Sequence, residues 1–168
     1  MRFFLFALFL AAAGWMSGCK TVQAPPPQTG TARELYRESQ DLSPLAVVVN
    51  TSSGLRVVLQ DSFLFKANRS ELTEAAVTKL DSIAAVLKNY PDNQVSVAAY
   101  EDSSGSKVRN MRISQRRAEA VQTELLQQGL PAGNVGAMGE GDENPVASND
   151  TPEGREQNRR IEIDITIP

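Results

Sequence analysis

The chain has 168 residues, enough for one folded domain with a hydrophobic core and too few for two domains of ordinary size. Hydrophobic residues make up 41% and charged residues 22%, a balance typical of a globular protein. The net charge of −3 argues against a general nucleic-acid binder, whose affinity would come from an excess of lysine and arginine. With no histidine and one cysteine, the sequence offers no intramolecular disulfide, zinc-ligand spacing or nucleophile–histidine pair. We therefore expect no metal and no cofactor.

The N-terminus has the features of a lipoprotein signal peptide. A basic residue precedes an apolar run from Phe3 to Ala13, which is about 11 residues and shorter than the roughly 20 needed to cross a bilayer as a helix. Met16-Ser17-Gly18-Cys19 follows and resembles the bacterial lipobox, in which small residues precede a cysteine that becomes lipidated. We predict a signal peptide over residues 1–18 and lipidation of Cys19; an ordinary secretory signal with an incidental cysteine is the alternative. Lys20, in place of Asp, favours the outer membrane over the inner.

Residues 19–44 are predicted to form a flexible tether. Ala24-Pro25-Pro26-Pro27 opens a segment with almost nothing to bury, and prolines favour extended backbone. At about 3.3 Å per residue, such a segment could reach roughly 80 Å. A tether of this kind would let a membrane-anchored domain search for a ligand away from the membrane.

The folded domain is predicted to span residues 45–168 and to begin with a hairpin. Two β-branched runs at 45–49 and 55–59 flank the turn-forming segment Asn50–Gly54. Three more strands are predicted at Gln94–Tyr100, at Val135–Met138 and at Ile161–Ile167. In the last of these, apolar residues alternate with charged or polar ones, a pattern typical of a strand with one buried and one wet face.

Two helices are predicted between these strands. The first begins near Ser70, a plausible N-cap, and carries apolar residues at spacings of 3 and 4 as far as Leu87. The second spans Lys107–Gln128, where Gly129 ends it. The order ββαβαββ predicts an α+β fold with two layers, in which both helices pack on one face of a mixed sheet. The glycines at 136, 139 and 141 do not fit a phosphate-binding loop and are interpreted as turns.

Several short motifs occur in order along this domain: Phe63-Leu64-Phe65, Asn68, Asp102-Ser103-Ser104-Gly105, Asn110–Ala118, Gly139-Glu140-Gly141 and Gly154–Arg160. Together they resemble the OmpA C-terminal domain of peptidoglycan-associated lipoproteins and stator proteins, over Phe65 to Ile167. The resemblance implies a non-enzymatic outer-membrane lipoprotein whose domain faces the periplasm. Its implied ligand is the peptide part of peptidoglycan.

In many Gram-negative walls the stem peptide carries diaminopimelate, whose side chain ends in an ammonium and a carboxylate. A protein carboxylate accepts hydrogen bonds from such an ammonium, and a guanidinium forks onto the carboxylate. The resemblance implies these two roles for Asp102 and Arg117, and adds Asn68, Asn110 and Arg159 as supporting contacts. Because lysine lacks the second carboxylate, such a site should prefer diaminopimelate.

Four of these five residues also have a purely structural interpretation. Asp102 could end a strand or cap the next turn, and Asn68 could be a turn residue ahead of a helix. Arg117 stands among other arginines and could belong to a solvated helix face with ordinary surface pairs. Arg159 precedes a strand that looks like a sheet edge, where charge discourages aggregation.

One departure from the family pattern lies beside the predicted site. The family usually has Gly-His-Thr-Asp where this chain has Ala99-Tyr100-Glu101-Asp102. Glu101 therefore places a second carboxylate next to Asp102. It could strengthen ammonium binding, repel the ligand carboxylate, or raise the pKa of one of the two acids.

Two other functions stay open. An enzyme without histidine would need a carboxylate pair or a Ser–Lys pair, and no spacing in this sequence singles one out. Alternatively, the altered motif has lost wall binding and the domain holds another envelope protein, through the tether or the hairpin face.

Overall fold

The computed structural model describes residues 46–66 and 69–168. The predicted signal peptide, Cys19, the tether and Asn68 lie outside the described residues. Among the helices within these ranges, none combines the length and the apolar character needed to cross a bilayer.

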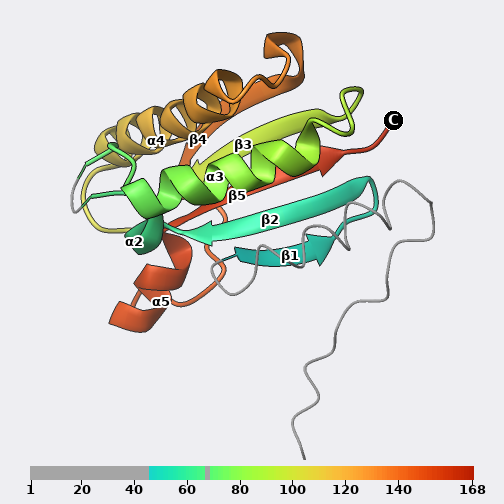
Figure 1. Cartoon of the computed structure of the whole chain (residues 1–168). Coiled ribbons are helices and arrows are strands. Elements are labelled where there is room, and N and C mark those ends of the chain that lie inside the picture. The colour runs from blue at the N-terminus through green and yellow to red at the C-terminus, as the bar shows by residue number, and fades with distance from the viewer. Residues whose placement is uncertain (1–45, 67–68) are drawn as a thin grey trace, which may run out of the picture.

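Five strands form one mixed sheet in the order β1-β2-β5-β3-β4 (Figure 1). Their bounds are β1 (Ala46–Asn50), β2 (Gly54–Gln60), β3 (Gln94–Tyr100), β4 (Val135–Gly141) and β5 (Arg160–Thr166). The hairpin is confirmed as β1 and β2, which pair antiparallel, while β3 and β4 pair parallel. The interpretation of the last strand as edge-like is wrong, because β5 lies between β2 and β3 at the centre of the sheet.

Two long helices, α3 (Glu74–Leu87) and α4 (Lys107–Gln127), cover one face of this sheet (Figure 1). Two short helices that the sequence did not predict, α2 (Asp61–Leu64) and α5 (Pro152–Asn158), lie at one end of the sheet. A single 3₁₀ turn, Ala132–Asn134, leads into β4. The predicted two-layer α+β architecture is confirmed, with α2 and α5 added to it.

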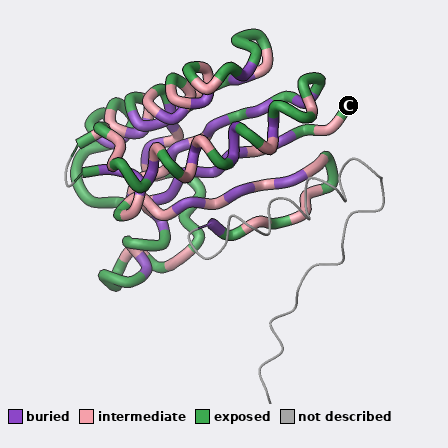
Figure 2. The backbone as a smooth tube through the Cα atoms, viewed as in Figure 1, coloured by how far each residue is buried: buried purple, intermediate pink, exposed green. Residues whose placement is uncertain are grey.

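The core lies between the sheet and the two long helices, and Figure 2 shows its buried backbone along the strands and the inner sides of the helices. Alternate strand residues point into it, and the largest are Leu55, Val57, Leu59, Val97, Ile161 and Ile163. From the helices they meet Leu80, Ile83, Val121 and Leu125. Each buried side chain of this size contributes roughly 1.5–3 kcal/mol relative to exposure, so this layer accounts for most of the driving force for folding.

Helix α3 begins later than the sequence predicted. Its N-cap is Thr73, whose hydroxyl accepts a hydrogen bond from the Ala76 amide at 3.0 Å and donates one to the Phe63 carbonyl at 2.9 Å. Leu72 is still extended there and forms an isolated bridge with Phe65. Thr73 rather than Ser70 is the N-cap, because its hydroxyl makes one hydrogen bond to α3 and another to α2 and so fixes the two helices together.

The glycines interpreted as turns lie within strand β4, which corrects that interpretation. A Cβ atom on Gly139 would come within 2.2 Å of the Gln115 backbone nitrogen, so β4 crosses directly beneath α4. The Gly141 amide donates to the Ser114 hydroxyl at 2.9 Å at the same crossing. This close approach fixes the N-terminal half of α4 beside the end of β3.

Candidate functional site

A cavity of about 420 Å³ opens at the end of the sheet where α2, α5 and the first turns of α4 meet. Its lining includes four predicted site residues, Asp102, Asn110, Arg117 and Arg159. The fifth, Asn68, is outside the described residues. The chain thus brings together residues that are up to 57 positions apart in the sequence, as Asp102 and Arg159 are.

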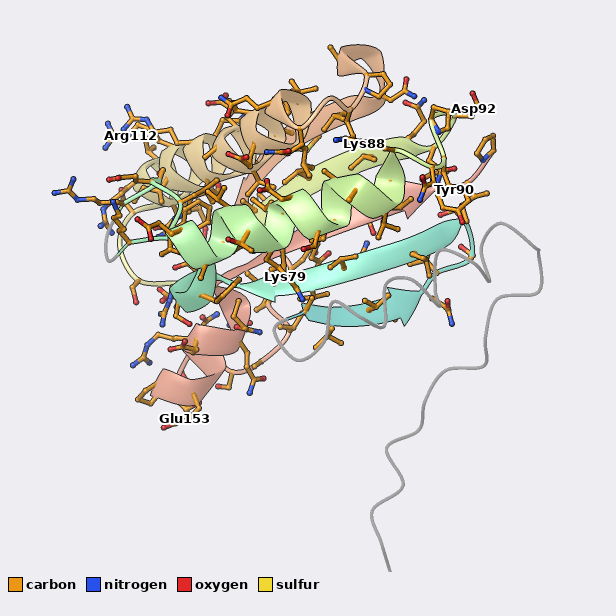
Figure 3. All side chains as sticks on the ribbon, viewed as in Figure 1. Lys79, Lys88, Tyr90, Asp92, Arg112 and Glu153 are labelled. Carbon is orange, nitrogen blue, oxygen red and sulfur yellow. The ribbon has the colours of Figure 1, made fainter. Side chains whose placement is uncertain are left out.

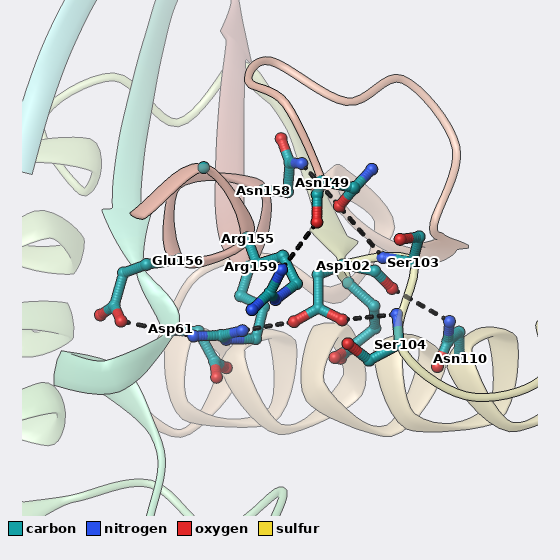
Figure 4. A network of polar contacts seen from close by, with 12 residues as sticks. Asp61, Asp102, Ser103, Ser104, Asn110, Asn149, Arg155, Glu156, Asn158 and Arg159 are labelled. Atoms are coloured by element: carbon teal, nitrogen blue, oxygen red, sulfur yellow. Dashed lines mark hydrogen bonds and ion pairs between the residues drawn. The ribbon is translucent and has the colours of Figure 1, made fainter. Parts of the chain in front are cut away.

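Asp102 lies two residues beyond the end of β3 and is 6% exposed. One carboxylate oxygen accepts a hydrogen bond from the Ser104 amide at 2.7 Å, and the other contacts the Arg159 guanidinium (Figure 4). Burial by itself would raise the pKa of Asp102, but the bonds from Ser104 and Arg159 outweigh it and hold the pKa below the usual 3.8. Asp102 therefore caps its turn and lines the cavity at the same time, as an ionised carboxylate.

Asn110 supports this turn from the first turn of α4. Its side-chain amide is buried and donates to the Asp102 carbonyl at 3.1 Å. The helix itself starts at the N-cap Ser106, whose hydroxyl accepts from the Arg109 amide. Asn110 thus fixes the backbone of Asp102 as well as lining the cavity.

The segment around α5 holds Asp102 from the other side (Figure 4). The buried Asn158 donates to the side-chain oxygen of Asn149 at 2.9 Å, and that same oxygen accepts from the Ser103 amide at 3.2 Å. A Cβ on Gly154 would come within 2.0 Å of the Ser148 carbonyl oxygen, so only glycine lets α5 pack this closely. The motif that contains Gly154 and Asn158 therefore builds the wall from which Arg159 reaches Asp102.

Arg117 lies on the buried face of α4 and is 5% exposed, which contradicts the interpretation as a solvated surface arginine. Its guanidinium lies over the Phe65 ring, 5.1 Å from the centroid, and donates from Nε to the Arg69 carbonyl at 3.3 Å. The neighbouring Arg109, Arg112 and Arg116 are exposed; Arg109 lines the cavity, whereas Figure 3 shows Arg112 extending away from the sheet.

Two carboxylates that were not among the predicted site residues hold Arg117. Its Nη1 lies 2.6 Å from Glu101 Oε1 and 3.1 Å from Asp61 Oδ1. Burial raises the pKa of both acids above the usual values, although the positive charge of Arg117 opposes that rise. The family departure at Glu101 thus has a definite structural result, an ion pair with Arg117 and a raised pKa.

The cavity lining mixes both signs of charge. Cationic side chains come from Lys66, Arg109, Arg117 and Arg159, and anionic ones from Asp61, Glu101 and Asp102. Such a lining suits a ligand that carries an ammonium and a carboxylate together. Among the residues that the structure describes, no group of three or more potential metal ligands is gathered.

The sequence did not reveal Asp61 as a site residue, and it did not reveal the role of Phe65. Phe65 stands in a quoted motif, but nothing in the sequence marks it as the ring beneath Arg117. Asp61 is a single acid next to the predicted hairpin strand, and only the unexpected helix α2 turns it toward the cavity.

Residues 64–159 match the model of the OmpA family. The chain belongs to the OmpA family. This membership confirms the resemblance seen in the motifs. The chain is 32% identical to outer-membrane lipoprotein YfiB of Pseudomonas aeruginosa over 162 residues, which cover 96% of this chain and 92% of that relative.

Two further relatives are matched over part of their length. The chain is 41% identical to probable lipoprotein YiaD of Escherichia coli, over 69% of this chain and 54% of the relative. It is 33% identical to peptidoglycan-binding protein ArfA of Mycobacterium tuberculosis, over 85% of this chain and 40% of the relative. The chain therefore spans about half the length of these two relatives.

Solved structures of OmpA-family domains share the fold. The cell wall anchor of the T6SS from Pseudomonas aeruginosa is 28% identical and superposes with a TM-score of 0.72, over 80% of this chain and 97% of that one. The peptidoglycan-associated lipoprotein from Burkholderia pseudomallei is 26% identical with a TM-score of 0.57, over 62% of this chain and 88% of that one.

Proposed function

We propose that this protein is a non-catalytic peptidoglycan-binding lipoprotein of the cell envelope. The observation that carries the proposal is the cavity in which the buried acid Asp102 and the buried base Arg117 both take part in the lining. The names of its relatives, a peptidoglycan-binding protein, a cell wall anchor and outer-membrane lipoproteins, point in the same direction.

The ligand we propose is the diaminopimelate of the stem peptide. Asp102, kept ionised by Ser104 and Arg159, would accept hydrogen bonds from the ligand ammonium. Arg117 would bind the carboxylate, since its planar guanidinium matches that group. Arg159 and Asn110 would support Asp102, and Asn68 would contact the peptide from the segment next to Lys66.

The membrane half of the proposal rests on the N-terminus. Lipidation of Cys19 would anchor the chain in the outer membrane, and residues 19–44 would let the domain reach the wall. We expect Cys19→Ser to release the protein into the soluble periplasmic fraction on cell fractionation. Retention of that variant in the outer membrane would refute the lipid anchor.

Co-sedimentation with purified sacculi tests wall binding directly. The full chain in mild detergent should pellet with diaminopimelate-type sacculi, and the Asp102→Ala, Arg117→Ala double variant should lose at least about tenfold in affinity, the effect expected for two lost charged contacts. Arg112→Ala is the matched control, because Arg112 lies on the outer side of the same helix, and it should bind like wild type.

Three outcomes decide the proposal. If wild type pellets no better than the double variant, wall binding is wrong. Competition by free diaminopimelate but not by lysine would support the finer claim on the ligand, and equal competition would refute it. Release of soluble muropeptides from the sacculi would refute the non-catalytic role.

A second function is favoured by one observation. On the edge strand β1, Val47 and Val49 are 62% and 41% exposed, which offers an apolar surface to another envelope protein. Under this alternative Val49→Asp would abolish partner capture and leave sacculus binding unchanged.

A further inference from the structure

The guanidinium of Arg117 is almost fully occupied by the protein's own groups. Nη1 has two N–H groups, and it faces Glu101 Oε1 at 2.6 Å and Asp61 Oδ1 at 3.1 Å. Nε and Nη2 both donate to the Arg69 carbonyl, each at 3.3 Å. Three of the five N–H donors of the guanidinium are hydrogen-bonded, the second N–H of Nη1 is engaged in the ion pair with Asp61, and one N–H of Nη2 is left over. A ligand carboxylate that binds with both oxygens needs two, so it must displace an existing partner.

Glu101 is the partner that can leave. It lies directly after β3, and its longer side chain has one more rotatable bond than that of Asp61, so its carboxylate can turn away from Arg117 while the backbone stays in place. The backbone is fixed at both positions, because the Asp61 amide donates to the Arg159 carbonyl at 3.1 Å and the Glu101 amide donates to the Gly141 carbonyl at 2.7 Å, so the difference lies in the side chains. Both carboxylates line the cavity, and Glu101 makes the shorter contact with Arg117.

We propose that Glu101 is an internal competitor for the wall ligand: its carboxylate occupies the place on Arg117 that the ligand carboxylate must take, so the domain binds peptidoglycan more tightly as the pH falls and Glu101 becomes protonated. This inference rests on the proposed function, and it concerns the regulation of the same site.

The surrounding charges fix the sign of the effect. Glu101 is faced by Asp61 from α2, by Asp102 in its own segment, by Arg117 from α4, and by Lys66 and Arg159 across the cavity. Burial, with help from Asp61 and Asp102, raises the pKa of Glu101 above 4.5 against the pull of Arg117. The ligand brings an ammonium and a carboxylate together and so adds little net charge, but its carboxylate takes the N–H of Arg117 away from Glu101, and the loss of that hydrogen bond raises the pKa further.

A pKa that rises on binding means that a proton is taken up, and linkage then requires the affinity to increase as the pH falls. Asp102 does not oppose this trend, because its pKa lies below 3.8 and it stays ionised for the ligand ammonium. The effect therefore develops in the window above 3.8, as the pH falls toward and through the raised pKa of Glu101.

Calorimetric titration of the full chain in mild detergent tests the inference, with a stem tripeptide ending in meso-diaminopimelate as the probe. Between pH 7.5 and pH 5.0 the wild-type affinity should rise, by at most about tenfold for each unit by which the ligand raises the Glu101 pKa. Repeating the titration in buffers of different ionisation enthalpy should show uptake of up to about one proton per ligand.

Glu101→Gln keeps the shape of the side chain and removes its charge. We expect it to bind more tightly than wild type at pH 7.5, with the pH dependence and the proton uptake lost. Asp61→Asn is the matched control on the other carboxylate; its affinity should still rise as the pH falls. Thermal unfolding followed by circular dichroism checks that both variants fold, and the wild-type series decides the matter if either does not.

These experiments distinguish failure of the competition by Glu101 from failure of the proposed wall binding. A wild-type affinity that is equal at the two pH values, or a Glu101→Gln variant that binds no tighter at pH 7.5, overturns the competition by Glu101 and leaves wall binding standing. A pH dependence that vanishes in Asp61→Asn but persists in Glu101→Gln also overturns it. If wild type binds no better than Asp102→Ala, Arg117→Ala at either pH, the proposed function itself fails.

Discussion

Arg159 and Arg160 are neighbours in the sequence, yet they belong to two different clusters of charge, one at the end of the sheet and one on the face that the long helices do not cover. The side chain of Arg159 is 30% exposed and lines the cavity beside Asp102. That of Arg160 is 4% exposed and lies on the face opposite α3 and α4, where it pairs with Glu162 at 2.7 Å. The charged groups of the first cluster can bind a ligand, whereas those of the second stabilise the fold.

The cluster behind the sheet is closed. Arg160 donates to the Asn144 carbonyl at 3.2 Å and to the Asn158 carbonyl at 3.3 Å, and the Tyr100 ring covers its guanidinium at 3.9 Å. Glu162 is also buried and receives a second cation, Arg56, at 2.8 Å. Every charge of this cluster has a partner within the sheet.

The cavity cluster has the same ingredients in a different setting. Asp102 with Arg159 and Arg117 with Glu101 are also paired acids and bases, but each faces an open space. A ligand can exchange its own charges for those partners without unfolding the sheet. Access, rather than the type of residue, thus distinguishes a binding pair from a structural one.

Breaking the closed cluster should have the largest effect. Arg160→Met leaves Glu162 buried with only Arg56, and loss of one partner of a buried ion pair costs about 3 kcal/mol or more of the free energy of unfolding. Urea unfolding measures this loss, and binding to sacculi under folding conditions should change little. A loss below about 1 kcal/mol would show that the cluster is not structural.

Breaking the cavity cluster at the adjacent residue should act mainly on binding. Arg159→Met should lower the free energy of unfolding by about 1 kcal/mol, since the pair is partly exposed, and reduce sacculus binding by about tenfold. The two variants, one residue apart, form a matched pair. Equal losses of stability, or unimpaired wall binding in Arg159→Met, would remove the distinction between the clusters.

The acid response of Asp102 gives Arg159→Met a second readout. A lowered pKa in the folded state contributes stability that is present above the unfolded-state value near 3.8 and is lost as the pH falls through the folded pKa. Without Arg159 the Asp102 pKa should rise. Stability of the variant should therefore fall less steeply than that of wild type below about pH 4, in urea unfolding at stepped pH.

The smallest effect is expected at the rim of the closed cluster. Arg56 forms two hydrogen bonds with Asp164, at 2.6 and 2.9 Å, but its side chain is 39% exposed. Arg56→Met should lower the free energy of unfolding by at most about 1 kcal/mol, as for exposed ion pairs. A loss as large as that of Arg160→Met would mean that the exposed pair of Arg56 and Asp164 stabilises the sheet as much as the buried Arg160 does.

Regular elements of the fold were predictable from local sequence. The hairpin and helix α4 follow from residue types, turn formers and the break at Gly129. The central position of β5 was not, because alternating charge normally indicates a wet face. In this sheet Arg160 and Glu162 are buried against each other and under Tyr100, which no local pattern reveals.

The candidate site was predictable only in part, for a similar reason. The motifs identify Asp102, Arg117 and Arg159, and the structure brings them to one cavity. The partners of Arg117 depend on tertiary contacts: Asp61 comes from a four-residue helix, and Glu101 was noticed only as a departure from the family pattern. Sequence reasoning left three consequences for Glu101 open, and its contact with Arg117 is what distinguishes among them.

The cavity is lined from position 61 to position 159, and its walls come from α2, the end of β3, α4 and the end of α5. No fragment shorter than residues 61–159 contains all of its lining, and both chain-distant pairs, Arg69 with Arg117 and Asp102 with Arg159, must form before it exists. Retention on the wall would consequently depend on cooperative folding of the whole domain. A partly folded or truncated chain would be left unattached, so binding would also act as a check on the quality of the folded protein.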